Sequence, residues 1–235
     1  MKRNKELLFT LATLLSHLIG AILLGLALVP GYLFITWVMS KVSGSLSEVT
    51  SAILICFAFG LGYFLFINSL LLLIVLTRQI LFLKNKETDS AIMSVTGLRL
   101  ATYNWLISLA KFFALPLVRT TPIIVWFYRG MGAKIGKNTL ISTTRLWDCD
   151  LIEIGKNSII GGNVAIACHL TTTLGKGILK KVKIGNRVSI GADTMIYPGV
   201  VIEDNVIVAP CSMVPIDSHL ERKSVYAGVP VEKIR

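Results

Sequence analysis

In the C-terminal part of the chain, an aliphatic residue recurs at every sixth position. The series is Ile184, Ile190, Ile196, Ile202, Val208 and Val214. Four residues after each of them the side chain is small or β-branched: Val188, Thr194, Val200, Val206, Ser212 and Ser218. This period is typical of a parallel β-helix, in which three six-residue units close a coil of about eighteen residues. The pattern therefore predicts a core built as a ladder of Ile and Val.

The same repeat extends upstream, with two interruptions. The matching aliphatic positions are Ile154, Ile160 and Ile166, preceded by Ile135 and Ile141 one residue out of phase. We expect the extra residue to form a bulge between residues 147 and 153, and bulges are often found beside functional sites. Residues 171–182 keep the count of six but lose the apolar pattern, so we expect a loop that leaves the coil there.

Two N-terminal stretches contain no Asp, Glu, Lys or Arg, namely Leu7 to Ser40 and Thr50 to Thr77. Each exceeds the roughly 20 residues that a membrane-spanning helix needs. They account for much of the high apolar content of 54%, and we expect two permanent transmembrane helices. The first stretch is long for a single span and contains Pro30-Gly31, which favours a kink or a break.

The distribution of charge predicts how these spans are oriented. Cations lie before the first span and after the second, whereas the segment between them has only Lys41, with Glu48. The outer cations are Lys2, Arg3, Lys5, Arg78, Lys84 and Lys86. The positive-inside rule then predicts a multi-pass protein of the inner or plasma membrane with both termini in the cytoplasm. His17 falls within the first span, where it either marks function or hydrogen-bonds a neighbouring helix.

Residues 88–130 form a third zone, between a two-helix anchor (1–87) and the β-helix (131–235). The expected helix face is Leu98, Ala101, Trp105, Leu109, Phe112 and Phe113. Arg99, Asn104 and Lys111 interrupt the apolar pattern too often for a bilayer span. An amphipathic helix at the membrane interface fits this pattern, and so does a helix packed on the spans or on the β-helix. Pro116 and Pro122 predict short helical pieces.

Net charge and cysteines exclude several classes of protein. The formal charge of +11 fits a basic face near anionic lipid and is compatible with a site for a phosphorylated cofactor. The sequence shows no nucleic-acid-binding fold or groove pattern, so we expect no nucleic-acid partner. The four cysteines are scattered and form no CxxC pair, so we expect neither a metal site nor a disulfide framework: Cys56, Cys149, Cys168 and Cys211.

The segment IGNRVSIGADTMIYPGVVIEDNVIVAPCSMV, followed by YAGVPVEKIR, resembles the hexapeptide-repeat, left-handed β-helix acyltransferases over about residues 131–235. The resemblance implies a mixed membrane and all-β fold class, with transmembrane and interfacial helices followed by a left-handed parallel β-helix. The stretch WDCDLIEIGKNSIIGGNVAIACHL is similar to the active-site region of acetyltransferases in this family. The form DLIEIG…HL is especially similar to membrane-associated β-helix domains of some peptide-synthetase-like proteins.

This similarity implies that His169 is the catalytic base and Asp148 an acceptor-side carboxylate, with Trp147 and Asp150 as candidates for substrate contacts. The chemistry agrees for His169, because acyl transfer from a thioester needs a base and an imidazole is suited to that task near neutral pH. Without the family pattern, His169 would read as an ordinary surface or core residue. Asp148 could orient the acceptor, orient the imidazole or form turn hydrogen bonds. Cys168 is not expected to be a nucleophile, because the family transfers acyl groups directly.

The donor implied by the resemblance is acetyl-CoA or another acyl-CoA, bound in the groove between neighbouring subunits of a homotrimer. The positions implied for pantetheine contacts are Ala192, Ala209 and Pro210, and those for the CoA phosphates are Lys233 and Arg235. The chain departs from the family pattern at two positions: Val229 stands where many members carry Asn, and Pro210 where Ala or Gly is usual. His219 lies outside the matched motif, and we expect it to be exposed.

The sequence therefore predicts a membrane-anchored, CoA-dependent O- or N-acyltransferase, most simply an acetyltransferase. The anchor favours an acceptor at the membrane surface, such as a lipid-linked sugar, a glycan precursor or a lipid headgroup. A carbonic anhydrase of the γ class shares the β-helix but requires three His ligands, and one of the three histidines here lies in a predicted span. The alternative that stays open is a non-catalytic, trimerising β-helix scaffold at the membrane.

Overall fold

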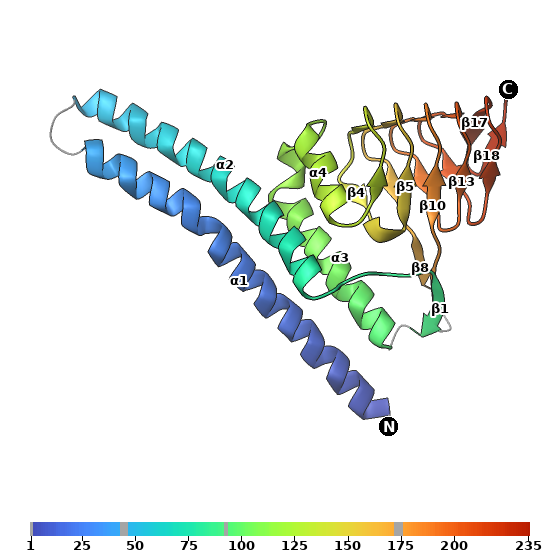
Figure 1. Cartoon of the computed structure of the whole chain (residues 1–235), viewed down its shortest axis with the longest axis horizontal. Helices are drawn as coiled ribbons and strands as arrows, with labels where there is room; N and C mark the ends of the chain where they lie inside the picture. Colours follow the sequence, from blue (N-terminus) through green and yellow to red (C-terminus); the bar gives the residue numbers. More distant parts are fainter. Residues whose placement is uncertain (1, 43–46, 92–93, 172–175) are drawn as a thin grey trace.

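The computed structural model describes residues 2–42, 47–91, 94–171 and 176–235. Two long helices, α1 (Lys2–Val42) and α2 (Glu48–Ile80), form an antiparallel pair that extends away from the rest of the molecule (Figure 1). Two shorter helices, α3 (Val95–Phe113) and α4 (Pro122–Gly130), follow and are joined through the 3₁₀ turn η1 (Leu115–Leu117). They lie between the long pair and a β-helix that ends at the C-terminus (Figure 1).

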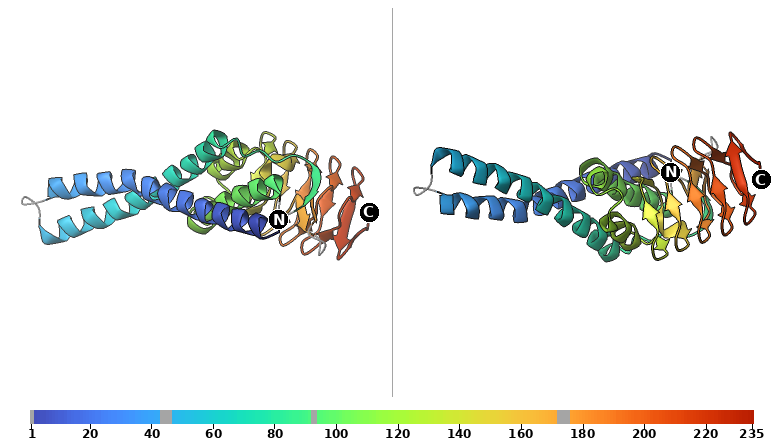
Figure 2. Two further views of the ribbon diagram at one scale, coloured as in Figure 1. Left: turned by 90° about the horizontal axis from the view of Figure 1, so that it is seen from below. Right: turned by 90° about the horizontal axis from the view of Figure 1, so that it is seen from above.

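Within the described residues, two helical stretches are long and apolar enough to cross a membrane by length and composition: Thr13–Val42 and Glu48–Ile80. Helix α1 continues through Pro30, so the break considered there is not found. The two helices approach closely at Gly31 and Gly62, where a Cβ atom on Gly31 would lie 2.6 Å from the Gly62 carbonyl oxygen. Figure 2 shows the distal half of the pair projecting well beyond the shorter helices.

Helix α3 packs on α1 and α2 rather than standing alone. Its buried side chains are Tyr103, Leu106, Ile107, Leu109 and Ala110. The predicted apolar face is therefore wrong in part, because Ala101 is exposed and Phe112 is 79% exposed. The physical reason is that α3 has neighbours on several sides, so its burial does not follow one stripe. Of the two alternatives for this helix, packing against the rest of the protein describes what is observed.

The C-terminal part is a parallel β-helix with three faces. The first face holds β2 (Lys134–Ile135), β5 (Ile152–Ile154), β10 (Val182–Ile184), β13 (Val201–Ile202) and β16 (His219–Leu220). The second holds β3 (Leu140–Ile141), β6 (Ile159–Ile160), β11 (Ser189–Ile190), β14 (Ile207–Val208) and β17 (Val225–Gly228), with β18 (Val231–Lys233) added antiparallel. The third holds β4 (Arg145–Leu146), β7 (Ala165–Ile166), β12 (Met195–Ile196) and β15 (Met213–Val214).

The register of the strands confirms the predicted ladder. Ile184 aligns with Ile202, and Ile196 aligns with Val214, each one coil further along. The small residues four positions later fill the corners of the coil. Some are buried aliphatics, such as Val206, and others bond to the next coil, as where the Thr194 hydroxyl donates to the Ala209 carbonyl at 3.1 Å. The predicted fold class, helices followed by a left-handed parallel β-helix, is confirmed.

Both predicted interruptions of the repeat are present. Leu146 aligns with Ile166, and the chain between β4 and β5 is lengthened by a 3₁₀ turn, η2 (Cys149–Leu151). Further on, Ile154 aligns with Ile184 instead of a residue eighteen positions later, because the chain leaves the coil in between. The Lys180 amide donates to the Cys168 carbonyl at 2.9 Å and closes this excursion.

The excursion differs from the predicted loop in its start and in its partners. It begins with β8 (His169–Thr171), two residues earlier than expected, and returns through β9 (Lys176–Leu179). Residues 172–175 lie outside the described part of the chain. Strand β1 (Thr88–Ala91) pairs antiparallel with β9 and completes a small sheet in the order β1-β9-β8. The zone expected to be helical from residue 88 thus opens with a strand that binds the excursion.

Candidate active site

Asp148 lies at the corner where the chain leaves the third face, and it is completely buried. Its backbone is left-handed, with φ 55° and ψ 49°. The carboxylate accepts three hydrogen bonds, from Asn104 Nδ2 at 2.8 Å, from the Cys168 amide at 3.3 Å and from His169 Nδ1 at 2.5 Å. A buried carboxylate is costly unless it is bonded in this way. These contacts fix its position and direct one oxygen to the imidazole.

His169 is the first residue of the excursion, one coil beyond Asp148. Its side chain remains 32% exposed. The hydrogen bond to Asp148 raises the pKa of His169, although partial burial acts in the opposite direction. When Nδ1 carries the proton that is donated to Asp148, the lone pair of the neutral ring is on Nε2. The pair is therefore arranged to present a basic nitrogen whose tautomer and orientation are set by a buried carboxylate.

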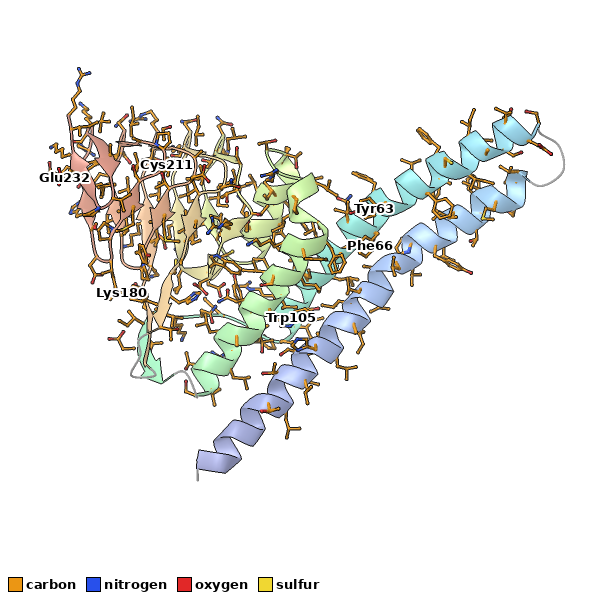
Figure 3. All side chains as sticks on the ribbon, turned by 180° about the vertical axis from the view of Figure 1, so that it is seen from behind. Tyr63, Phe66, Trp105, Lys180, Cys211 and Glu232 are labelled. Atoms are coloured by element: carbon orange, nitrogen blue, oxygen red, sulfur yellow. The ribbon has the colours of Figure 1, made fainter. Side chains whose placement is uncertain are left out.

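Asn104 is a site residue that the sequence analysis missed, since it counted only as an interruption of an apolar face. It reaches Asp148 from α3, and its own Oδ1 is buried without a hydrogen-bond partner. The next residue, Trp105, lies between α3 and α1 (Figure 3). Its Nε1 donates to His17 Nε2 at 3.3 Å, and His17 Nδ1 lies 2.7 Å from the Thr13 carbonyl. Of the two interpretations of His17, hydrogen bonding to a neighbouring helix matches this arrangement.

Trp147 directly precedes Asp148 and is partly buried against the core. The Lys111 ammonium from α3 lies 5.0 Å from the centre of its ring. Burial and the nearby Arg145 guanidinium both lower the pKa of Lys111. The structure thus brings Trp147 together with Asp148 and adds two cations that the sequence analysis did not assign.

The carboxylate of Asp150 does not join the group formed by Asp148, His169 and Trp147. Its carboxylate forms an ion pair with Arg78 of α2 and accepts from the Asn85 amide at 2.8 Å, which leaves its side chain only 2% exposed. Burial raises the pKa of Asp150 against the effects of these partners. The contact joins the long helices to the first coil. Cys149 and Cys168 are fully buried, and burial raises the pKa of both thiols.

The residues expected to contact CoA lie elsewhere on the β-helix. Ala192, Ala209 and Pro210 are at the corner between the second and third faces, whereas His169 is at the corner between the third and the first. Four or five extended residues, about 15 Å, separate two corners of one coil. Lys233 is paired with Glu221 at 2.6 Å, and Arg235 is held on β17 by a backbone hydrogen bond. Within a single chain, the residues expected to contact CoA therefore lie apart from His169.

Other sequence expectations concern metals and histidines. Over the ranges that the structure describes, no group of three or more His, Cys, Asp or Glu side chains could hold a metal ion. His219 is exposed as expected, and its Nε2 lies 3.0 Å from a Glu203 carboxylate oxygen. It is thus remote from the predicted base and belongs to a regular coil.

The repeat is also found by comparison with known proteins. The family described as "Bacterial transferase hexapeptide (six repeats)" matches residues 181–215. The maltose O-acetyltransferase of Clostridium difficile 630 shares the fold, with a TM-score of 0.50 and 19% identity over 63% of this chain and 92% of that one. Residues 181–215 thus carry the hexapeptide repeat that the resemblance implied, and the β-helical part has the fold of this acetyltransferase.

Curated relatives each match somewhat less than half of the chain. A protein named "Putative acetyltransferase YvoF" from Bacillus subtilis is 35% identical over 114 residues, and the galactoside O-acetyltransferase of Escherichia coli is 32% identical over 118. The delta-poly-L-ornithine synthetase of Acinetobacter baumannii is 34% identical over 105 residues. These matches cover 46%, 47% and 45% of this chain. They span 66%, 57% and 8% of the respective relatives.

Proposed function

We propose that this protein is a membrane-anchored acetyltransferase in which His169 is the general base. The observation that carries the proposal is the 2.5 Å contact between His169 Nδ1 and a buried Asp148 carboxylate. Two of the relatives named above are acetyltransferases, which supports acetyl-CoA, or another acyl-CoA, as the donor. The acceptor is a hydroxyl or amine carried by a lipid-linked sugar, a glycan precursor or a lipid headgroup.

In the proposed reaction, His169 Nε2 removes the proton from the acceptor hydroxyl or amine as that atom attacks the carbonyl carbon of the thioester. The new bond from oxygen or nitrogen to carbon forms, the carbon–sulfur bond breaks, and the imidazolium returns the proton to the departing sulfur. Asp148 keeps Nδ1 protonated and stabilises the imidazolium while it holds the extra proton. Asp148 thus acts through His169, so we assign it a positioning role.

The membrane part of the proposal rests on α1 and α2. Both helices expose large apolar side chains along their length, among them Leu14 (61% exposed) and Phe57 (68% exposed). Bilayer contact would cover this surface, and the cations outside the two spans favour cytoplasmic termini. The ion pair between Arg78 and Asp150 would then hold the site close to the bilayer.

A homotrimer is part of the same proposal. Because Ala192 and Ala209 lie on a different corner from His169, a donor that contacts all three would have to lie between two subunits. The groove between neighbouring β-helices is where the family resemblance places the pantetheine arm. We therefore expect each site to use His169 of one subunit and the second corner of another.

The test measures acetyl-CoA binding and thioester cleavage by the detergent-purified full chain with a panel of membrane glycan and lipid acceptors. His169→Ala should retain acetyl-CoA binding and lose turnover by about 10²- to 10⁴-fold. Cross-linking or light scattering on the same sample reports the oligomeric state. An intact trimer that binds no acetyl-CoA would contradict the proposal and favour the non-catalytic scaffold.

A further inference from the structure

Two cations near Trp147, the residue before Asp148, have no anionic partner among the residues that the structure describes. Lys111 comes from α3 and lies over the Trp147 ring, and Arg145 comes from β4, two residues before Trp147, close enough to Lys111 to lower its pKa. Neither cation forms an ion pair with any residue that the structure describes. By contrast, Lys134, Lys180 and Lys233 on the same β-helix are each paired with a carboxylate. Two unpaired like charges close together favour binding of an anion between them.

The local geometry leaves room for such a ligand. Arg145 uses one N–H group in a 3.4 Å hydrogen bond to the Asn163 carbonyl, and a guanidinium has five such groups. On the strand of the next coil, Ala165 aligns with Arg145, so the neighbouring side chain is small. Lys111 and Arg145 are both partly exposed, which gives a ligand access from solvent.

Helix α3 connects these cations to the catalytic pair. Asn104 contacts Asp148, and Lys111 lies seven residues further along the same helix, over Trp147. Seven residues are about two turns, so both side chains lie on one face roughly 10 Å apart along the axis. One face of α3 therefore contacts both the Asp148 carboxylate and the Trp147 ring, so the cations and the catalytic pair adjoin the same helix.

We propose that Lys111 and Arg145, next to Trp147, form a phosphate-binding subsite for a substrate of the reaction at His169. The inference rests on the proposed function, because it gives the substrate a phosphate group. Phosphate suits a guanidinium and an ammonium that lie near each other, since both donate charge-assisted hydrogen bonds to its oxygens. The phosphate belongs either to the membrane acceptor or to the CoA donor.

The experiment measures binding of inorganic pyrophosphate to the detergent-purified full chain by calorimetry at low ionic strength. Lys111→Gln and Arg145→Gln should each weaken pyrophosphate binding by about tenfold, because each removes one charge-assisted contact. The matched control is the double variant Lys137→Gln with Lys156→Gln, which removes two exposed cations from another corner and should leave binding unchanged. Lys111→Arg should retain most of the affinity, which separates loss of charge from damage to the fold.

A second arm identifies the substrate that carries the phosphate. If the Lys111→Gln, Arg145→Gln double variant weakens acetyl-CoA as much as pyrophosphate, the donor's phosphates occupy the subsite. If acetyl-CoA binds as before, the subsite belongs to the acceptor. No measurable pyrophosphate binding to the natural protein, or equal binding to both double variants, would overturn the inference. Neither binding measurement requires turnover. Failure of this inference can therefore be distinguished from failure of the acetyltransferase proposal.

Discussion

The regular and the irregular coils of the β-helix differ in length, contacts and chemistry. From Ile184 onward, successive core residues align eighteen positions apart, as Ile184 with Ile202 and Ile202 with Leu220. Before Ile184 no coil keeps this spacing, because η2 and the β8–β9 excursion lengthen the chain. The long helices also lie at this irregular end of the β-helix, where Arg78 of α2 pairs with Asp150 (Figure 1).

The candidate chemistry lies where the repeat is broken. A regular coil turns each corner with side chains that bond to the next coil, as Thr194 does, and this satisfies its polar groups within the ladder. At η2 and at the start of β8, the backbone departs from the ladder and places Asp148 and His169 against each other. The regular repeat therefore provides a rigid frame, and the candidate site of Asp148 and His169 lies at its interruptions.

The largest expected effect comes from replacing one histidine in the irregular coils and comparing it with replacement of one in the regular coils. His169→Ala should reduce acetyl transfer by about 10²- to 10⁴-fold, because the attacking group loses its base. His219→Ala changes an exposed histidine of a regular coil and should leave turnover unchanged. Initial rates of thioester cleavage at saturating substrates give the comparison. Similar losses in both variants would show that the two regions do not differ in chemistry.

A smaller effect is expected from Asp148→Asn, which keeps the size of the side chain but removes its charge. We expect kcat to fall about 10- to 100-fold, because the amide no longer enforces the tautomer with the lone pair on Nε2. The base works when neutral, so activity rises as the pH increases through the pKa of His169. Because Asp148 raises that pKa, the rising limb of the pH–rate profile should move to lower pH in the variant.

The corresponding measurement is kcat against pH for the natural protein and for Asp148→Asn. The natural protein should have its rising limb above the ordinary histidine value of about 6.5. A limb that stays in place while kcat falls would mean that Asp148 contacts the acceptor instead of setting the state of the imidazole.

The sequence predicted much of this structure because the ladder is a periodic signal. Positions such as Ile190 and Val208 are defined by spacing alone, and even the extra residue near Asp148 appeared as a change of phase. Contacts between distant segments have no such signal. Asn104 reaches Asp148, and β1 pairs with β9, across long separations in sequence, and neither segment carries a local pattern that names its partner.

Asp150 shows a second limit of prediction from the sequence. The family pattern grouped it with Asp148, two residues away, as a candidate substrate contact. The 3₁₀ turn between them sends the two carboxylates to different partners, so that Asp150 pairs with Arg78 of α2. Residues adjacent in a motif can thus have separate roles when a turn lies between them, and only the backbone path decides this.

Two glycines at the corner between the second and third faces test which position of the turn is tightly packed in the regular and irregular coils. A Cβ atom on Gly191, between the second and third faces of a regular coil, would lie 2.3 Å from the Pro210 nitrogen. Backbone cannot move aside easily, so Gly191→Ala should lower the free energy of unfolding by about 1–3 kcal/mol. Gly162 lies at the same corner one coil earlier, one residue after Gly161, which aligns with Gly191, and it has no atom within 4 Å of the added Cβ.

Gly162→Ala is therefore the matched control, and it should leave stability unchanged or raise it by about 0.4–1 kcal/mol through the unfolded state. The measurement is the denaturant midpoint of the detergent-purified variants. Equal destabilisation by both alanines would show that the position within the turn does not decide how well a side chain is tolerated at this corner.

The smallest effect is expected from Asn104→Ala, which tests whether the helices contribute to the site or only anchor it. The amide donates to Asp148 at 2.8 Å, so its removal leaves one carboxylate oxygen with one hydrogen bond fewer in a buried place. We expect a roughly 3- to 10-fold decrease in kcat, consistent with loss of one charge-assisted hydrogen bond that acts through a second residue. The Michaelis constants for donor and acceptor should change little.

Asn104→Ala should also move the rising limb of the pH–rate profile slightly upward. Losing a donor makes the Asp148 carboxylate a stronger acceptor for the protonated imidazole, which raises the pKa of His169 further. This shift is opposite in sign to that of Asp148→Asn, so it distinguishes a positioning effect from general damage. Asn68→Ala, which removes an exposed amide from α2, is the control and should change neither quantity. If Asn104→Ala behaves like this control, the helices serve the site only by holding it in place.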